Sequence, residues 1–246
     1  QQQQKEEEKE KLREILKEID KKRDTWKDIK RGTKKLGIAL IGVAGINKIN
    51  HEILKRISKE YKRLPRKKKK TFLTYVMSLI NAIVFVGASA NSLYKVKTIN
   101  IKKSLITTKI SQERYENLGY IEMAYFIHDI IQEETIWTTN TMHHSIGIAF
   151  LAVLVTKVKP LLKLLPQWMI VDISTIFLDT AWIMKETKNT KTKMYTAVQL
   201  AFAISFFILR VSYLPILIHN FLKEKELEKV EFYDKIKTYI KIAILA

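Results

Sequence analysis

Long apolar stretches separated by dense blocks of charge are the feature that most limits what this chain can fold into. A soluble domain would interleave apolar and polar residues at the period of a helix or a strand. Here several apolar stretches approach the roughly 20 residues that a helix needs to cross a bilayer. They are residues 71–94, 118–137, 142–158, 167–184 and 195–222. The sequence therefore predicts a multi-pass membrane protein.

Helices are the secondary structure that these stretches favour. A membrane barrel needs alternating strands of about ten residues, and the sequence has no such pattern. In lipid every backbone polar group must be bonded internally, which a helix achieves within its own segment. We therefore expect an all-α, polytopic transmembrane bundle of about five to six spans. The sixth would be a bent or half-inserted piece bracketed by Pro160 and Pro166.

Polar, amphipathic extensions flank the predicted bundle, which we place at residues 66–222. Residues 1–65 begin with a charged segment whose apolar residues recur at helical spacing, and a short apolar stretch follows at 36–46. That stretch is too short to span, so it is interfacial, re-entrant or packed against another protein. The tail, 223–246, is also amphipathic. The charged segment 1–35 is either a docking helix or a solvated helix with charge pairs four residues apart.

The chain carries a net charge of +19, which suits an anionic partner. The densest basic run directly precedes the first span, where cations bind anionic lipid headgroups. Nucleic acid fits poorly, because no stacking aromatics alternate with the lysines. We therefore expect membrane lipids, especially anionic ones, as partners and no nucleic acid. The expected anionic lipid-binding residues are Arg63, Arg66, Lys67, Lys68, Lys69 and Lys70.

Ionisable side chains inside the predicted spans are the most informative residues. A charge at the bilayer centre costs on the order of 2.5–3.5 kcal/mol, so such groups usually face the bundle interior and pair. Asp172 and Asp179 are seven residues apart, as are Glu122 and Asp129, so each pair shares one helix face. We expect Arg210 to pair with Asp129, Asp172 or Asp179. The residues expected in a shared polar cavity are Asp129, His128, His143, His144, Asp172, Ser174, Asp179 and Arg210.

Each of these residues also has a simpler explanation when it is taken alone. His143 and His144 could lie at the membrane interface, Asp172 could lie at a helix N-terminus, and Arg210 could snorkel. Their joint occurrence in successive spans favours one cavity. The chain has no cysteine, which excludes a thiolate metal site or a cysteine nucleophile, and no metal is expected.

Four segments of the predicted bundle form an ordered series of motifs. They are NLGYIEMAYFIHDII, TMHHSIGIAFLAVLV, IVDISTIFLDTAWIM and FFILRVSYLPILI. In order and separation they resemble the TLC domain, the domain of ceramide synthase-related multi-pass membrane proteins. Asp129 matches the family aspartate, and His143 and His144 match its histidine pair. The other matching residues are Asp172, Ser174, Thr175, Phe177, Arg210, Val211 and Pro215.

The sequence departs from the family pattern at several positions. His128 stands where tyrosine usually precedes the aspartate, Asp172 replaces glutamate, and Ile176 replaces proline. The longer acidic and histidine pattern of the ceramide synthases is not visible around His143. The resemblance is therefore nearer to the branch of TLC-domain-containing proteins that is linked to membrane lipid composition.

The resemblance and the drifted motifs imply a non-catalytic, lipid-binding accessory or scaffold subunit of a larger membrane complex. Bound phospholipid is expected, and the protein partners would dock through residues 1–50 and 223–246. The basic charge and the start at Gln1 fit a processed organellar subunit. The mitochondrial inner membrane is therefore the expected location, with the endoplasmic reticulum second.

The alternative is an acyl-CoA-dependent N-acyltransferase of the ceramide synthase type, or a regulator of membrane lipid composition, in the endoplasmic reticulum. In the enzyme, His143 or His144 would be the catalytic base that takes a proton from an attacking amine. Asp129 or Asp172 would orient that imidazole, and Arg210 would hold a carboxylate or phosphate. Acyl-CoA would be the substrate, and no cofactor is expected in either case.

Overall fold

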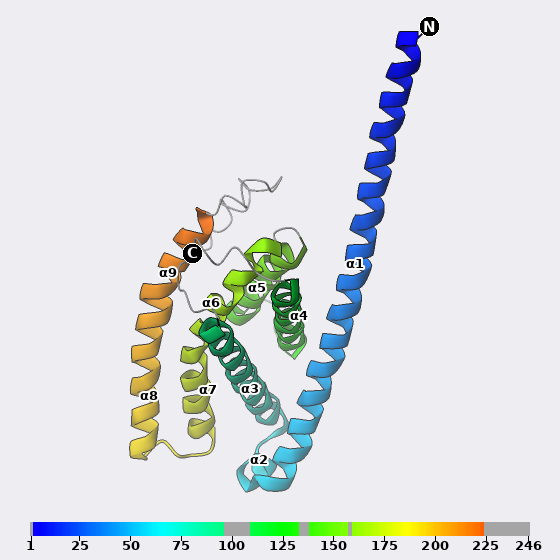
Figure 1. Ribbon diagram of the computed structural model, residues 1–246. Coiled ribbons are helices and arrows are strands. Elements are labelled where there is room, and N and C mark those ends of the chain that lie inside the picture. The colour runs from blue at the N-terminus through cyan, green and yellow to red at the C-terminus, as the bar shows by residue number, and fades with distance from the viewer. Residues whose placement is uncertain (1, 96–108, 133–137, 157–158, 224–246) are drawn as a thin grey trace.

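The computed structural model describes residues 2–95, 109–132, 138–156 and 159–223, which form helices and no strands (Figure 1). This confirms the all-α class. The tail at 224–246 lies outside the described residues. The elements are α1 (Gln2–Ile57), α2 (Lys59–Arg63), α3 (Arg66–Lys95), α4 (Lys109–Gln132), α5 (Thr139–Thr156), η1 (Lys159–Leu164), α6 (Leu165–Met169), η2 (Ile170–Asp172), α7 (Ile173–Glu186), α8 (Lys193–Phe206), η3 (Phe207–Tyr213) and α9 (Leu214–Leu222).

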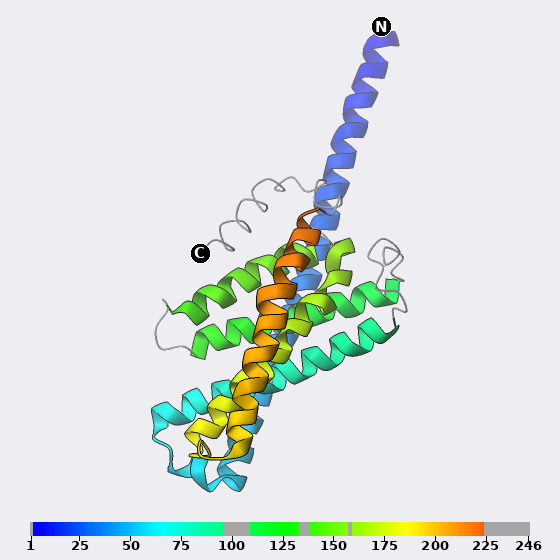
Figure 2. The same ribbon diagram turned by 90° about the vertical axis from the view of Figure 1, so that its left-hand side faces the viewer.

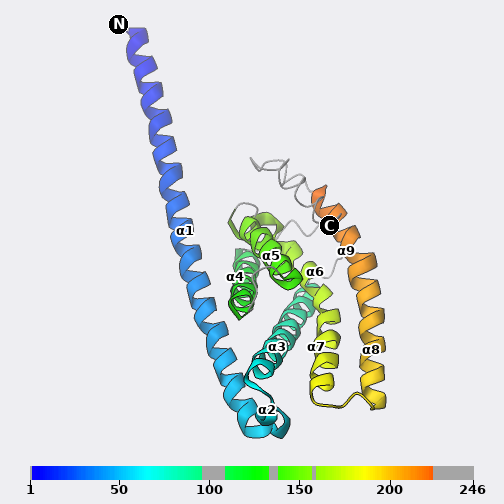
Figure 3. The same ribbon diagram turned by 180° about the vertical axis from the view of Figure 1, so that it is seen from behind.

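The first helix, α1, is continuous over 56 residues and extends well past the other helices (Figures 1 and 3). The charged segment and the apolar stretch 36–46 therefore belong to one helix, because no proline interrupts them. One face of the apolar stretch packs on the chain's own bundle, where Val43 is buried against Met77 and Ala124. Ile38, Ile41 and Ile46 of the same stretch are exposed. Arg31 and Lys35 add ion pairs to Glu116 of α4, at 3.4 and 3.0 Å.

A tight helical turn joins α1 to α3. The Ser58 side chain accepts a hydrogen bond from the Tyr61 amide at 3.0 Å and caps α2. The Tyr61 ring is buried, and its hydroxyl contacts Nδ1 of His51. Burial raises the pKa of Tyr61, so the phenol keeps its proton at neutral pH. Pro65 then precedes α3, whose first residue is Arg66.

The helix α7 runs antiparallel to α3, and α8 packs on the outer side of α7 (Figure 1). Lys68 reaches Glu186 at 3.3 Å near one end, and Tyr75 stacks on Trp182 further in, with ring centroids 3.8 Å apart. On the other side of α3, α4 and α5 lie side by side, inclined to α1 (Figure 2).

By length and apolar composition, Arg66–Ser92 and Lys193–Phe221 are candidate membrane spans within the described part of the chain. They correspond to the first and last of the predicted spans. The three predicted spans between them correspond to α4, to α5 and to the broken segment that ends in α7. These three do not pass the same test, so five to six spans remain a prediction.

The segment between α5 and α7 is broken into short pieces, as its two prolines predict. Residues 159–172 form the 3₁₀ turns η1 and η2 around the five-residue α6. Leu161, Leu162 and Leu165 of this segment are buried in the main hydrophobic core. Phe150, Trp168 and Phe221 then join α5, α6 and α9 through edge and tilted ring contacts.

Candidate functional site

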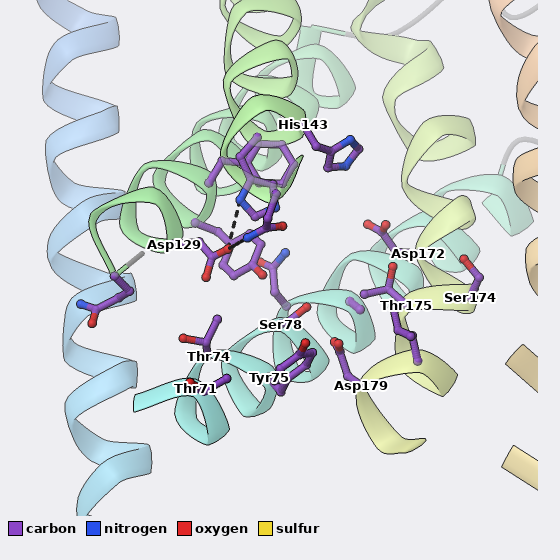
Figure 4. A pocket seen from close by; sticks show the side chains of 18 of the residues that line it. Thr71, Thr74, Tyr75, Ser78, Asp129, His143, Asp172, Ser174, Thr175 and Asp179 are labelled. Atoms are coloured by element: carbon purple, nitrogen blue, oxygen red, sulfur yellow. Dashed lines mark hydrogen bonds and ion pairs between the residues drawn. The ribbon is translucent and has the colours of Figure 1, made fainter. Parts of the chain in front are cut away.

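A cavity of about 610 Å³ lies between α3, α4, α5, α7 and the α8–η3 helix (Figure 4). Each helix contributes polar side chains at helical spacing, so that one face of each helix turns inward. The expected residues Asp129, His143, His144, Asp172, Ser174, Asp179 and Arg210 all line it. The physical expectation behind the sequence analysis, that these groups meet inside the bundle, is therefore what the structure shows.

One face of α3 forms a polar wall, and only its two lysines, as part of the basic run, were expected from the sequence. Its residues recur three or four positions apart, which was the signal that could have revealed them. A neutral hydroxyl group in a membrane span costs far less free energy than a charge does, so it does not by itself indicate a polar cavity. The lining residues of this wall are Lys67, Lys70, Thr71, Thr74, Tyr75, Ser78 and Asn81.

The basic run before α3 is divided between the cavity and the outside. Lys67 and Lys70 line the cavity, whereas the other four cations of the run do not. Lys68 instead pairs with Glu186 at the end of α7. The run thus faces two different surroundings, and of its six cations only Lys67 and Lys70 line the space where a ligand would lie.

The α4–α5 side of the cavity holds a histidine–aspartate pair. Nδ1 of His144 lies 3.1 Å from Oδ2 of Asp129, and both side chains are buried. Asn140 donates a hydrogen bond to the same oxygen at 3.0 Å. The Phe126 ring stacks on His144 with centroids 4.6 Å apart, which fixes the imidazole plane. The His143 ring points into the space between α5 and α7 (Figure 4).

The α7–η3 side holds a guanidinium cluster. Arg210 donates from Nε to Ser174 Oγ at 2.9 Å and from Nη2 to Thr175 Oγ1 at 2.8 Å. Its Nη2 also lies 3.7 Å from Asp172 Oδ1, so the expected pairing of Arg210 with a carboxylate is met by Asp172.

A π-helical turn presents Arg210 to this cluster. The Leu214 amide donates to the Leu209 carbonyl, five residues back, instead of four. Pro215 follows, has no amide hydrogen, and crowds the carbonyl four residues before it. The proline therefore gives a local reason for the wide turn, which displaces Arg210 from regular α-helical register.

Two further carboxylates complete the lining. Glu122 is buried and accepts a hydrogen bond from Asn81 at 3.3 Å. Asp179 is only 2% exposed, faces Ser78 of α3 (Figure 4), and has one oxygen, Oδ2, without a hydrogen-bond partner among the described residues. The spacing of seven residues therefore placed both Glu122 and Asp179 correctly on inward faces.

His128 is the expected cavity residue that the structure places elsewhere. Its Nε2 lies 3.2 Å from Nδ2 of Asn47, on the α1 side of α4, and it does not line the cavity. The reason is geometric: adjacent residues on a helix point about 100° apart. With Asp129 turned inward, His128 has to face α1.

The resulting chemistry is that of a polar pocket with both signs of charge. Within the described residues, no group of three or more His, Asp and Glu side chains is placed to hold a metal ion. The histidine–aspartate pair has the arrangement of an imidazole base oriented by a carboxylate. The guanidinium is already engaged by Ser174, Thr175 and Asp172, which makes it a rigid part of the wall.

Comparison with known proteins identifies one similarity. The family model described as the TLC domain matches residues 71–246, well over half of the chain. The match includes residues 223–246, which the sequence analysis placed outside the resemblance. No curated protein and no solved structure matches the chain.

Proposed function

This chain belongs to the TLC-domain family, and we propose that its cavity binds the polar headgroup of a membrane lipid. The family makes it a membrane protein associated with lipids. The observation that supports the headgroup proposal is the convergence of Asp129, His144, Asp172 and Arg210 on one cavity. Placing such groups at membrane depth is costly, and a polar ligand offsets part of that cost.

The surroundings of the cavity suit the rest of a lipid molecule. Both candidate spans contribute to its wall, α3 through its polar face and α8 through Phe202 and Phe206. The outer surface of α8–η3 exposes large apolar side chains next to these residues, among them Ile204, Phe207 and Ile208. Acyl chains would lie along this apolar surface while the headgroup occupies the cavity.

Filling the cavity tests this proposal. Thr74 lines the cavity and is half-buried, so Thr74→Phe places a ring where the headgroup would lie. The matched control is Thr196→Phe, on the exposed surface of α8. In native mass spectrometry from mild detergent, we expect wild type and the control to retain phospholipid and Thr74→Phe to lose most of it. Equal retention by both variants would contradict the proposal.

The accessory role in a larger assembly is part of the same proposal, and the shape of α1 supports it. The amino-terminal part of α1 projects past the other helices (Figure 3), and a projecting charged helix is suited to docking. We propose that residues 1–50 and 223–246 bind the protein partners. The mitochondrial inner membrane is the proposed location, with the endoplasmic reticulum as the alternative.

Deleting residues 2–22 tests the docking role without touching the ion pairs of Arg31 and Lys35 with α4. In native gel electrophoresis of mitochondrial membranes, we expect wild type to migrate within a large complex and the deletion variant to migrate alone. A second deletion, of 223–246, tests the tail in the same way. Wild type that always migrates alone, or a doubly deleted chain that stays in the complex, contradicts the accessory role.

Acyl transfer is the second candidate, and the His144–Asp129 contact in the cavity favours it. An imidazole of His143 or His144 would take the proton of an amine as that amine attacks the acyl-CoA thioester carbonyl. The amide bond forms, the carbon–sulfur bond breaks, and the CoA thiolate leaves and is protonated. Purified protein should then acylate a long-chain base, and His143→Ala or His144→Ala should abolish the reaction. No transfer to several amine acceptors would exclude this candidate.

A further inference from the structure

The carboxylate of Asp179 is the strongest indication of what chemical group the cavity receives. It is 98% removed from solvent by the protein, yet Oδ2 has no hydrogen-bond partner in the described part of the chain. A buried acceptor left unpaired costs about 1–3 kcal/mol. Asp179 lines the cavity, so a ligand held there could supply the missing donor.

The surrounding side chains leave this donor position to a ligand. Ser78 on α3 is a hydrogen-bonding neighbour of the Asp179 carboxyl group, but Oδ2 keeps no partner among the described residues. The nearby side chains of Asp129 and Asp172 are themselves acidic. The one guanidinium of the cavity wall, Arg210, is committed to Ser174, Thr175 and Asp172. The neighbourhood of Asp179 is therefore acidic, and a cationic donor is the complementary group.

Charge of the opposite sign lies toward the start of α3. Lys67 and Lys70 line the same cavity on the same helix face as Ser78. Lys70 precedes Ser78 by eight residues, which is about 12 Å along the helix axis. The flexible stem of a lysine lets its ammonium move within that gap. Along α3, the cavity thus has lysine cations near the start of the helix and the unpaired carboxylate of Asp179 about two helical turns later.

We propose that the cavity selects a zwitterionic headgroup with a phosphate and a primary ammonium, the chemistry of an ethanolamine phospholipid. The ammonium donates to Oδ2 of Asp179, and the phosphate contacts Lys67 and Lys70. The inference rests on the proposed function, because it specifies which lipid the headgroup site prefers. A choline headgroup has no N–H to donate, and a phosphatidic acid headgroup has no cation.

Competition between lipids on the full-length wild-type protein tests the selection without a mutation. The probe is a phosphatidylethanolamine labelled on its acyl chain, bound to purified protein in detergent micelles. Unlabelled phosphatidylethanolamine should compete roughly tenfold better than phosphatidylcholine or phosphatidic acid with the same acyl chains. Equal competition by all three would overturn the headgroup assignment while leaving lipid binding intact. If no lipid binds at all, the proposed function fails, and this inference fails with it.

Two variants test which residues cause the preference for phosphatidylethanolamine. Asp179→Asn keeps the shape of the side chain and removes its charge, so phosphatidylethanolamine should lose its roughly tenfold advantage while phosphatidylcholine binds as before. Lys67→Gln with Lys70→Gln should weaken both of these lipids alike, because both carry the phosphate. The matched control is Asp24→Asn, on the exposed face of α1, which should leave the preference unchanged. A preference that survives Asp179→Asn overturns the role of Asp179.

A soluble molecule could carry the same phosphate and ammonium groups into the cavity. A further competition experiment distinguishes such a molecule from a lipid. Phosphoethanolamine has the phosphate and the ammonium but no acyl chains. At the lipid's effective concentration we expect it to leave the labelled probe bound. Displacement of the probe by phosphoethanolamine would assign the site to a soluble ligand and overturn the lipid assignment.

Discussion

Arg210 is bound by three oxygen-bearing side chains at once, which explains how a guanidinium is accommodated in an apolar helix. Ser174 and Thr175 accept from it at 2.9 and 2.8 Å, and Asp172 lies 3.7 Å away. The planar guanidinium presents donors in several directions, which a lysine ammonium on a flexible stem cannot do with the same geometry. The cluster therefore ties η3 to the start of α7.

Removing the guanidinium should destabilise the fold, and removing its carboxylate partner as well should not add the full loss of the second single variant. Arg210→Gln leaves Asp172 without its cation, and we expect the free energy of unfolding to fall by about 1–3 kcal/mol. Adding Asp172→Asn removes the unpaired charge, so the double variant should lose less than the sum of the two single losses. Thermal unfolding in detergent measures all three variants. Strictly additive losses would show that the two residues do not interact.

Spacing within the sequence predicted the charged residues of the cavity better than the neutral ones. Pairs seven residues apart placed Asp172 with Asp179 and Glu122 with Asp129 on inward faces, because two helical turns return to the same direction. Ser78 and Thr74 were missed, since a hydroxyl in a span gives no energetic signal of its own. His128 was misplaced because every ionisable residue of the span was expected to face inward, although adjacent residues on a helix point in different directions. The missing hydrogen-bond partner of Asp179 Oδ2 could not be predicted, because residue spacing does not define the positions of side-chain atoms.

At the scale of elements, two glycines let α4 and its neighbours approach closely. A Cβ added at Gly147 of α5 would lie 2.6 Å from Cε2 of Phe126, and one added at Gly119 of α4 would lie 2.8 Å from Cγ1 of Val155. Small residues at helix contacts have the same role in membrane bundles generally. The Gly147 contact matters for the cavity, because the Phe126 ring also stacks on His144.

Gly147→Ala should therefore disturb the cavity wall through Phe126. Overpacking of this kind typically costs about 1–3 kcal/mol, and we expect a lower unfolding temperature together with weaker lipid retention. Gly87→Ala is the matched control on α3, because a Cβ there meets nothing within 4 Å. It should be neutral or slightly stabilising, since alanine favours a helix more than glycine does. Equal effects of the two substitutions would argue against the close contact.

Element boundaries were predictable only where the chain has strong local signals. Pro160 and Pro166 predicted the broken segment between α5 and α7, because proline removes a helical hydrogen bond. The continuity of α1 was not predictable from the local pattern: residues 36–46 differ in polarity from their flanks and contain three glycines, which disfavour a helix, yet the helix runs through them. Their burial against Met77 and Ala124 comes from tertiary packing, which the local pattern does not contain.

At the scale of the whole molecule, the antiparallel packing of α3, α7 and α8 decides which chain segments lie at each end of the bundle. The start of α3 and the α7–α8 turn lie at one end, as the Lys68–Glu186 pair indicates. The end of α9 lies at the other end, on the side toward which α1 projects (Figure 1). If α3 and α8–α9 both cross the membrane, the two ends lie in different compartments.

Labelling of single cysteines tests this topology directly, because the chain has no cysteine of its own. Arg66→Cys and Asn189→Cys should react with an impermeant maleimide from one side of sealed vesicles, and Lys223→Cys from the other. All three positions are exposed in the structure. Reaction of all three from the same side would contradict the spanning of α8–α9.

An experimental density map of the protein in lipid nanodiscs would show whether polar groups from separate helices enclose one cavity that holds a lipid headgroup. We expect Asp129, His144, Asp172, Asp179 and Arg210 around a single cavity, with lipid density whose polar end lies against Asp179. A map in which these five side chains lie on separate lipid-facing or aqueous surfaces would contradict this expectation.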